Sequence, residues 1–260
     1  MRSGWDRASP WLCIGVLFML GLRPSTPTPW DAAVARTVGG GPESVQATPI
    51  RWSLEVGRRR AVGAGEAALG PGGRFAVSLR GPVGLVPMLR LRGDGEAVSV
   101  TLAGARRHWV ADEAAGVLAT VGAPALDDLV GLALGHVPVT RDHLREVRTT
   151  ATGLWTRWDL RGRPLVLELD PEGSVRRARL LDEDGVPLVS MTWAADGVEV
   201  VAADADARLR LSGLRWSPVV GRMPTFAVSA PLGFDSSPIE MALDDGVLVF
   251  LMGELIRPPR

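Results

Sequence analysis

Apolar and polar residues alternate along most of the chain beyond residue 50. Phe75, Val77 and Leu79 fall on one side of an extended segment, and Ser78 and Arg80 fall on the other. A period of two is typical of β-strands that bury one face. The same alternation recurs in later segments, which contribute Leu89 and Leu91, Val98, Val100 and Leu102, Leu165, Leu167 and Leu169, Val189, Met191 and Trp193, and Leu209 and Leu211.

Short turn signals separate these segments. They are built from glycine, proline, aspartate and glutamate, at residues 70–73, 93–95, 170–173, 182–185 and 244–246. Such residues tolerate positive φ or preset a tight turn. Strands joined by short turns form an antiparallel meander, and we count about eleven candidate strands.

One interval departs from the strand pattern. Residues 112–136 lack hairpin dipeptides and are rich in alanine and leucine. The spacing predicts a helix over 125–134, with Pro124 before its first turn, Gly135 as its stop and an apolar stripe of Leu126, Leu129, Val130 and Ala133. The apolar face of so wide a sheet must be buried. We therefore expect a mainly β fold, a curved antiparallel half-barrel whose mouth is covered by this helical lid or insertion.

The N-terminal region differs from the rest of the chain. Arg2 and Arg7 precede an apolar stretch at residues 11–22, which is shorter than the roughly 20 residues that span a bilayer. This pattern predicts a signal peptide or N-terminal anchor within residues 1–23. Residues 24–49 are rich in proline, glycine, serine and threonine and predict a linker. A single β domain is then expected over 50–260.

Composition narrows the possible partners. The chain carries 29 basic and 29 acidic residues, a net charge of +0 at pH 7. A domain that binds nucleic acid usually shows a basic footprint, so we expect no nucleic-acid partner. The single cysteine, Cys13, excludes an internal disulfide framework and a multi-cysteine metal site.

Catalytic motifs are missing from the sequence. No segment has the spacing of a nucleophile elbow, a zinc-protease helix or a phosphate-binding loop. His136 and His143 flank Pro138 at a separation that matches no common pair of metal ligands. We expect no catalytic residue, no metal and no cofactor, and we expect the protein not to be an enzyme. A hydrolase would need a serine or aspartate that converges with one of the three histidines.

Three passages carry a family resemblance. Residues 65–69 and 75–79, which lead into Gly81-Pro82-Val83-Gly84, resemble early strands and a Pro-Leu-Gly loop. Residues 129–139 read Leu-Val-Gly-Leu-Ala-Leu-Gly-His-Val-Pro-Val and are similar to a helix with a Gly-x-Pro-x-Pro-like exit. Residues 226–234 resemble a closing strand that carries phenylalanine, proline and glycine. In this order the passages resemble the bacterial outer-membrane lipoprotein carrier and receptor proteins, the LolA/LolB superfamily.

The resemblance implies a carrier whose apolar concavity takes acyl chains. Its partners would be acylated lipoproteins or lipids, at the periplasmic face of the bacterial cell envelope, in the periplasm or at the outer membrane. It also implies a membrane-contact loop, with Val83 and Leu85 in the positions of that loop, and we expect a monomer. The strand pattern predicts the inward-facing lining of the cavity as Phe75, Val77, Leu79, Leu89, Leu91, Val98, Val100, Trp158, Met191, Trp193, Leu209 and Phe226.

A second hypothesis assigns the same fold a different function. In it the protein is an envelope sensor or assembly module that binds a protein partner, and side chains fill its core. A cavity too small for an acyl chain would favour this reading.

Overall fold

The strands follow the predicted alternation and pair into one large sheet. In this computed structural model the described residues are 29–38, 43–81, 88–104, 106–112, 126–203, 206–219 and 224–238. Its first run of strands consists of β1 (Gln46–Val56), β2 (Arg59–Leu69), β3 (Phe75–Arg80), β4 (Leu89–Gly93), β5 (Ala97–Leu102) and β6 (Arg107–Asp112). The second run consists of β7 (Leu144–Thr150), β8 (Gly153–Leu160), β9 (Arg163–Leu169), β10 (Val175–Leu181), β11 (Pro187–Ala194), β12 (Gly197–Ala202) and β13 (Ala207–Ser212).

Strand β1 joins the two runs. Neighbours pair in the order β15-β6-β5-β4-β3-β2-β1-β13-β12-β11-β10-β9-β8-β7. The pairing of β1 with β13 places Trp52 opposite Leu211 and Leu54 opposite Leu209, so the apolar faces of the two runs are continuous. The described sheet has 15 strands and is open, with edges at β15 and β7. The count of about eleven expected from turn signals was therefore too low.

Two of the additional strands explain part of the low count. The short strands β14 (Ser217–Pro218) and β15 (Asp235–Pro238) are too short to show a period of two. β14 pairs with β1, and β15 pairs with β6 in parallel. Every other strand pair of the described sheet is antiparallel, as the meander pattern predicts.

A glycine on β2 makes room for the Trp52 side chain. The indole Nε1 donates to the backbone oxygens of Arg80 at 3.0 Å and Ala64 at 3.2 Å. A Cβ at Gly63 would lie 1.9 Å from the Arg80 oxygen and 2.7 Å from the indole nitrogen. Glycine at this position therefore lets the backbone of β3 and the Trp52 ring approach β2 together.

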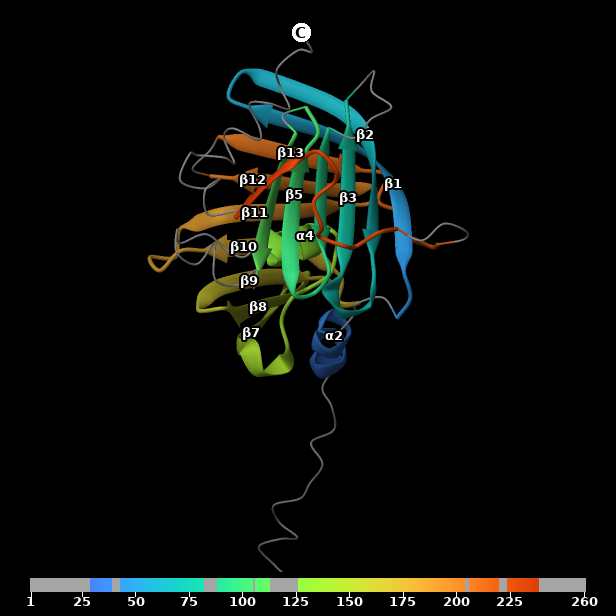
Figure 1. The fold of residues 1–260 in the computed structure, drawn as a ribbon. Helices are drawn as coiled ribbons and strands as arrows, with labels where there is room; N and C mark the ends of the chain where they lie inside the picture. The colour runs from blue at the N-terminus through green and yellow to red at the C-terminus, as the bar shows by residue number, and fades with distance from the viewer. Residues whose placement is uncertain are drawn as a thin grey trace, which may run out of the picture.

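The predicted helix is present and ends where expected. Helix α4 spans Leu126–Ala133, and Gly135 follows it with a φ of +90°. The His136 N–H donates to the Gly131 oxygen at 2.8 Å, and the Gly135 N–H donates to the Leu132 oxygen at 2.9 Å. This pair of bonds is a Schellman stop, which requires a left-handed residue that glycine adopts without strain. Figure 1 shows α4 between the two runs of strands, in the hollow of the sheet, rather than across its mouth.

Part of the expected linker is folded. Helix α2 spans Pro29–Thr37, and its Ala33 and Val34 are buried in the core. The Thr37 hydroxyl donates to the Gly173 oxygen at 2.8 Å. The folded unit therefore begins before residue 50, and the linker prediction for residues 24–49 is wrong for this helix. Proline- and threonine-rich sequence surrounds this helix, so its apolar residues gave no clear helical signal. Ala33 packs against Gly173 in the turn after β9.

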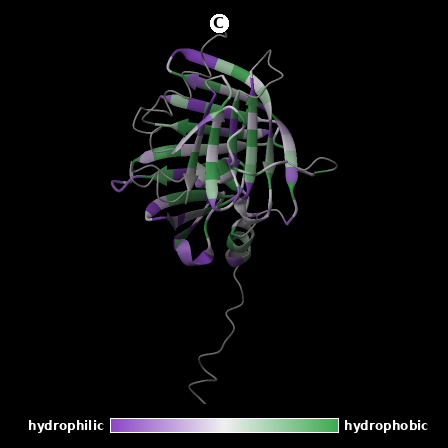
Figure 2. Cartoon of the chain, in the orientation of Figure 1, coloured by the Kyte–Doolittle hydropathy of each residue, from purple (hydrophilic) through white to green (hydrophobic). Residues whose placement is uncertain are grey.

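Hydrophobic and hydrophilic residues are interleaved along the strands, as Figure 2 shows. Two single-turn helices complete the described elements, η1 (Pro71–Gly73) and η2 (Arg141–His143). Among the described residues, no helix is long and apolar enough to cross a membrane. The same residues hold no group of three His, Cys, Asp or Glu side chains that could bind a metal ion.

Candidate functional site

The inner face of β3, β4 and β5 in the first run is apolar. The register places Val77 opposite Leu91 and Leu91 opposite Val100, so these residues of β3, β4 and β5 share one face. Leu91 is half-buried and packs against the core. Buried beside it are Phe75, Val77, Leu79, Leu89, Val98 and Val100. These residues therefore share one buried face, and their role as the lining of a lipid cavity stays a prediction.

The second run supplies the opposite wall. Trp158 on β8 is fully buried, and its indole nitrogen donates to the Thr156 hydroxyl at 2.8 Å. Met191 on β11 is buried, and Trp193 and Leu209 are half-buried against the same core. The indole bond satisfies the polar atom of a side chain that otherwise presents only apolar surface.

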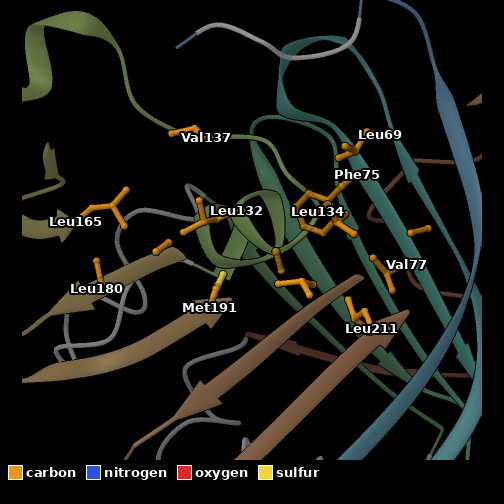
Figure 3. Close-up of a cluster of buried hydrophobic side chains, with 14 of the residues drawn as sticks. Leu69, Phe75, Val77, Leu132, Leu134, Val137, Leu165, Leu180, Met191 and Leu211 are labelled. Carbon is orange, nitrogen blue, oxygen red and sulfur yellow. The ribbon is translucent and has the colours of Figure 1, made fainter. Parts of the chain in front are cut away.

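Helix α4 occupies the space between the two walls. Figure 3 shows Leu134 beside Phe75, and Leu132 on the side of Met191. Both leucines are 2 % exposed and belong to the same buried cluster as the two walls. In this arrangement the side chains of α4 and of Leu134 fill the space between the two walls.

An ion pair connects α4 to the sheet. The Asp128 carboxylate is 2.8 Å from Nε of Arg161, in the turn between β8 and β9. The Asp128 side chain is 6 % exposed and that of Arg161 is 40 % exposed. Water reaches the Arg161 guanidinium but hardly reaches the Asp128 carboxylate. If the ion pair opens, the Arg161 charge therefore stays hydrated.

No protein-family model matches the chain, and no curated protein matches it. Solved structures do match its fold. A putative outer membrane lipoprotein-sorting protein domain from Vibrio parahaemolyticus superposes with a TM-score of 0.50 at 12% identity, covering 85% of this chain and 97% of that one. A LolA superfamily protein from Nitrosomonas europaea gives a TM-score of 0.48 at 7% identity, covering 74% and 92%. A DUF1329 family protein from Desulfovibrio piger ATCC 29098 gives 0.47 at 9% identity, covering 73% and 90%.

The chain has a LolA-like fold. The order of strands and helix read from the sequence therefore led to the right fold. The likeness is one of architecture, since few residues are identical.

One predicted lining residue lies elsewhere in this LolA-like fold. Phe226 belongs to the segment 224–234, which crosses the outer face of β3 and β5 (Figure 1). Its ring lies under the Arg74 guanidinium, 5.4 Å from ring centre to Cζ. The prediction that Phe226 faces inward is wrong because this segment forms no strand whose alternation could fix its facing. Val83 and Leu85, the predicted membrane-contact loop, lie outside the described residues.

Several buried residues of the hollow were not predicted from the sequence. Ile50, Trp52 and Leu54 of β1 are buried and alternate with polar residues. The period of two was therefore present in β1, at the boundary of the presumed linker. The sequence pattern predicts a lid over the segment that contains Leu132 and Leu134. Periodicity within one segment does not show what that segment packs against.

A buried histidine ties the outer segment to the sheet. The His108 imidazole is 2.8 Å from the Thr101 hydroxyl through Nδ1, and 2.9 Å from the Val228 oxygen through Nε2. Burial lowers the pKa of His108; the bond to Val228 opposes this shift and the charge of Arg92 adds to it. The ring is therefore neutral near pH 7, and the carbonyl of Val228 requires that Nε2 carry the proton. The two bonds hold the segment that contains Val228 against β5 and β6.

Proposed function

We propose that this protein is a non-enzymatic carrier that binds acyl chains in the hollow now filled by α4. The observation that carries the proposal is the pairing of two wide apolar walls with the short helix α4 between them. Leu134 lies beside Phe75 of one wall and Leu132 lies on the side of Met191 of the other, so an acyl chain that displaced them would meet the same surfaces. The Vibrio protein with this fold is described as a lipoprotein-sorting domain, which agrees with such a cargo.

The free energy lost when the leucines are exposed is comparable to the free energy gained when an acyl chain is buried. Exposure of a buried leucine costs roughly 1.5–3 kcal/mol, and burial of each methylene of an acyl chain returns about 0.8 kcal/mol. A long acyl chain therefore offsets the exposure of Leu132 and Leu134 and the loss of the Asp128–Arg161 contact. Transfer needs no catalytic group, because one apolar site exchanges its ligand for another.

This function places the protein at the periplasmic face of the bacterial envelope. Its partners are acylated lipoproteins or lipids, during lipoprotein transport or outer-membrane insertion. The apolar stretch at residues 11–22 supports export to that compartment.

The test starts from full-length protein expressed with envelope targeting. Native mass spectrometry with lipid extraction is expected to find a co-purifying acylated species. The delipidated protein is expected to take up a fluorescent fatty acid, and Asp128→Asn is expected to raise its affinity because the helix is held less firmly. Glu55→Gln, which removes an exposed ion pair with Arg60 on β1 and β2, is the matched control and is expected to leave uptake unchanged.

A filled core favours a second function. The protein would then be an envelope module that binds a protein partner and keeps α4 in place. A clean apo mass, with no fatty-acid uptake by wild type or Asp128→Asn, would overturn the carrier proposal and support this one.

A further inference from the structure

Three polar residues of β5 and β6 are buried although they point away from the hollow. The register places Thr101 opposite His108, and strand alternation puts Ser99 on the same outer face, opposite to that of Val100. Ser99 and His108 are each 1 % exposed, and Thr101 is 6 % exposed. Residues 224–238, which we call the arm, cross this face over β3 and β5 and continue as β15 beside β6 (Figure 1). The arm therefore occupies a site on the sheet that is distinct from the hollow.

The site holds the arm through main-chain carbonyl groups. Nη1 of Arg92 donates to the Ala227 oxygen at 3.2 Å, and Nε2 of His108 donates to the Val228 oxygen at 2.9 Å. Two adjacent carbonyls of the arm are thus bound by side chains that project from β4 and β6. Hydrogen bonds to main-chain atoms give affinity for an extended segment without requiring a particular sequence.

An aromatic side chain adds selectivity to the site. The Phe226 ring lies under the Arg74 guanidinium, 5.4 Å from ring centre to Cζ, and a Cβ at Gly70 would lie 3.1 Å from the edge of the same ring. A guanidinium over the face of a phenyl ring attracts it electrostatically, and the glycine leaves room for the ring. The site therefore fits an extended segment with a phenylalanine directly before the first carbonyl that it binds.

The arm fills this site incompletely. Each residue of 224–237 is half-buried or exposed, and the Leu232 side chain is fully exposed. Within the part of the chain that the structure describes, the buried Ser99 hydroxyl has no hydrogen-bond partner. A buried hydroxyl without a partner lowers stability, and a segment that buries little apolar area detaches easily. The arm is therefore an occupant that a better-matched segment can replace.

We propose that the arm site binds an extended segment of a partner protein, and that the arm covers the site until such a segment displaces it. The segment would place a phenylalanine under Arg74 and present main-chain carbonyls to Arg92 and His108. It would also donate a main-chain N–H to the Ser99 hydroxyl, a bond that the arm does not make. It would pair in parallel with β6, as β15 does. The site faces away from the hollow, so segment binding and acyl binding succeed or fail independently.

The first experiment uses the full chain and a labelled synthetic peptide with the sequence of residues 224–238. Phe226→Ala in the chain weakens the arm and leaves the residues beneath it unchanged. A competing arm lowers the apparent affinity by the fraction of sites that it leaves open, so the variant is expected to bind the peptide at least about tenfold more tightly than wild type. Leu232→Ala, a change at the fully exposed side chain of the same arm, is the matched control and is expected to bind as wild type does.

A peptide that carries Phe226→Ala is expected to bind the Phe226→Ala chain at least about tenfold more weakly than the unchanged peptide. Equal affinities of wild type and the Phe226→Ala chain for the unchanged peptide, or no binding to either, would overturn the proposal. Circular dichroism is expected to show the variants folded, because the arm adds no residue to the described core. Phe226→Leu, which keeps most of the apolar area, replaces Phe226→Ala if structure is lost.

The second experiment separates a partner segment from the arm. Peptides with a fixed phenylalanine and varied neighbours are titrated against the Phe226→Ala chain, with and without Ser99→Ala. Some are expected to bind at least about tenfold more tightly than the arm peptide and to lose this advantage with Ser99→Ala, because a bond to a buried hydroxyl is removed. The arm peptide is the control and is expected to be insensitive to Ser99→Ala. A library with no peptide tighter than the arm peptide, or an advantage that survives Ser99→Ala, would overturn the partner and leave the arm as a permanent cover.

Discussion

Phe75 packs directly over Gly93, its partner across β3 and β4. A Cβ at Gly93 would lie 2.4 Å from the edge of the phenyl ring, closer than real carbon contacts allow. The ring is 1 % exposed and lies beside Leu134, the residue that follows α4 (Figure 3). The glycine therefore provides the room in which Phe75 forms one wall of the hollow.

Gly93→Ala is expected to lower the free energy of unfolding by about 1–3 kcal/mol, because the ring must leave its rotamer or push on α4. Gly104→Ala, in the turn after β5 with open space around its Cβ position, is the control and is expected to be nearly neutral. Urea denaturation followed by tryptophan fluorescence measures both. Phe75→Leu in the Gly93→Ala background is expected to recover part of the loss, and no recovery would mean that the clash is not with Phe75.

The docking of α2 is testable through two closely similar turns. Asp170 and Asp182 each accept a backbone N–H within their turns, and Gly173 and Gly185 follow with φ of +88° and +83°. Only Gly173 faces α2, since its Cβ would lie 2.7 Å from the Ala33 oxygen.

Both Gly173→Ala and Gly185→Ala introduce left-handed strain of about 1 kcal/mol. Gly173→Ala is expected to cost roughly 1–3 kcal/mol more and to expose α2 to limited proteolysis. Equal unfolding free energies and equal cleavage rates would show that α2 does not depend on this contact.

The strands could be predicted because their signal is local. Phe75, Val77 and Leu79 alternate within one segment, and the stop at Gly135 depends on residues next to it in the chain. The covering elements could not be predicted in this way. Thr37 reaches Gly173 across 136 residues, and Arg92 reaches the Ala227 oxygen across 135.

The hollow illustrates the same limit. The apolar residues that alternate along β3, β4 and β5 share one buried face, because period two fixes facing once a strand exists. The alternation gave no information on what the face packs against. Phe226 shows the complementary failure, since its segment has no partner strand to set its orientation and binds the outer face through Arg74 instead.

Stability is expected to fall as the pH drops below about 6.5, the ordinary pKa of histidine. Burial lowers the pKa of His108 and of His136 in the folded state, so the unfolded chain binds more protons in the window between the folded and unfolded pKa values. Protonation of the unfolded chain therefore favours unfolding as the solution is acidified through this window.

Urea midpoints between about pH 8 and pH 5 measure this dependence, in a range where carboxylates stay ionised. His108→Gln is expected to reduce the slope and to cost about 1 kcal/mol at pH 8 through its altered bonds to Thr101 and Val228. His108→Gln with His136→Gln is expected to flatten it further. An unchanged slope in the double variant would assign the dependence to other groups.

The exchange of α4 for an acyl chain predicts opposite effects for two equally buried residues. Leu132 on α4 and Met191 on β11 are each 2 % exposed. Replacement of either by alanine is expected to cost about 2–5 kcal/mol of stability. Leu132→Ala weakens only the helix that must leave, so it is expected to raise the affinity for a fluorescent fatty acid. Met191→Ala removes part of the wall that the acyl chain contacts, so it is expected to lower that affinity. Fatty-acid titrations at a temperature where both variants are folded compare the two, and a change of the same sign in both would contradict displacement of α4 by the ligand.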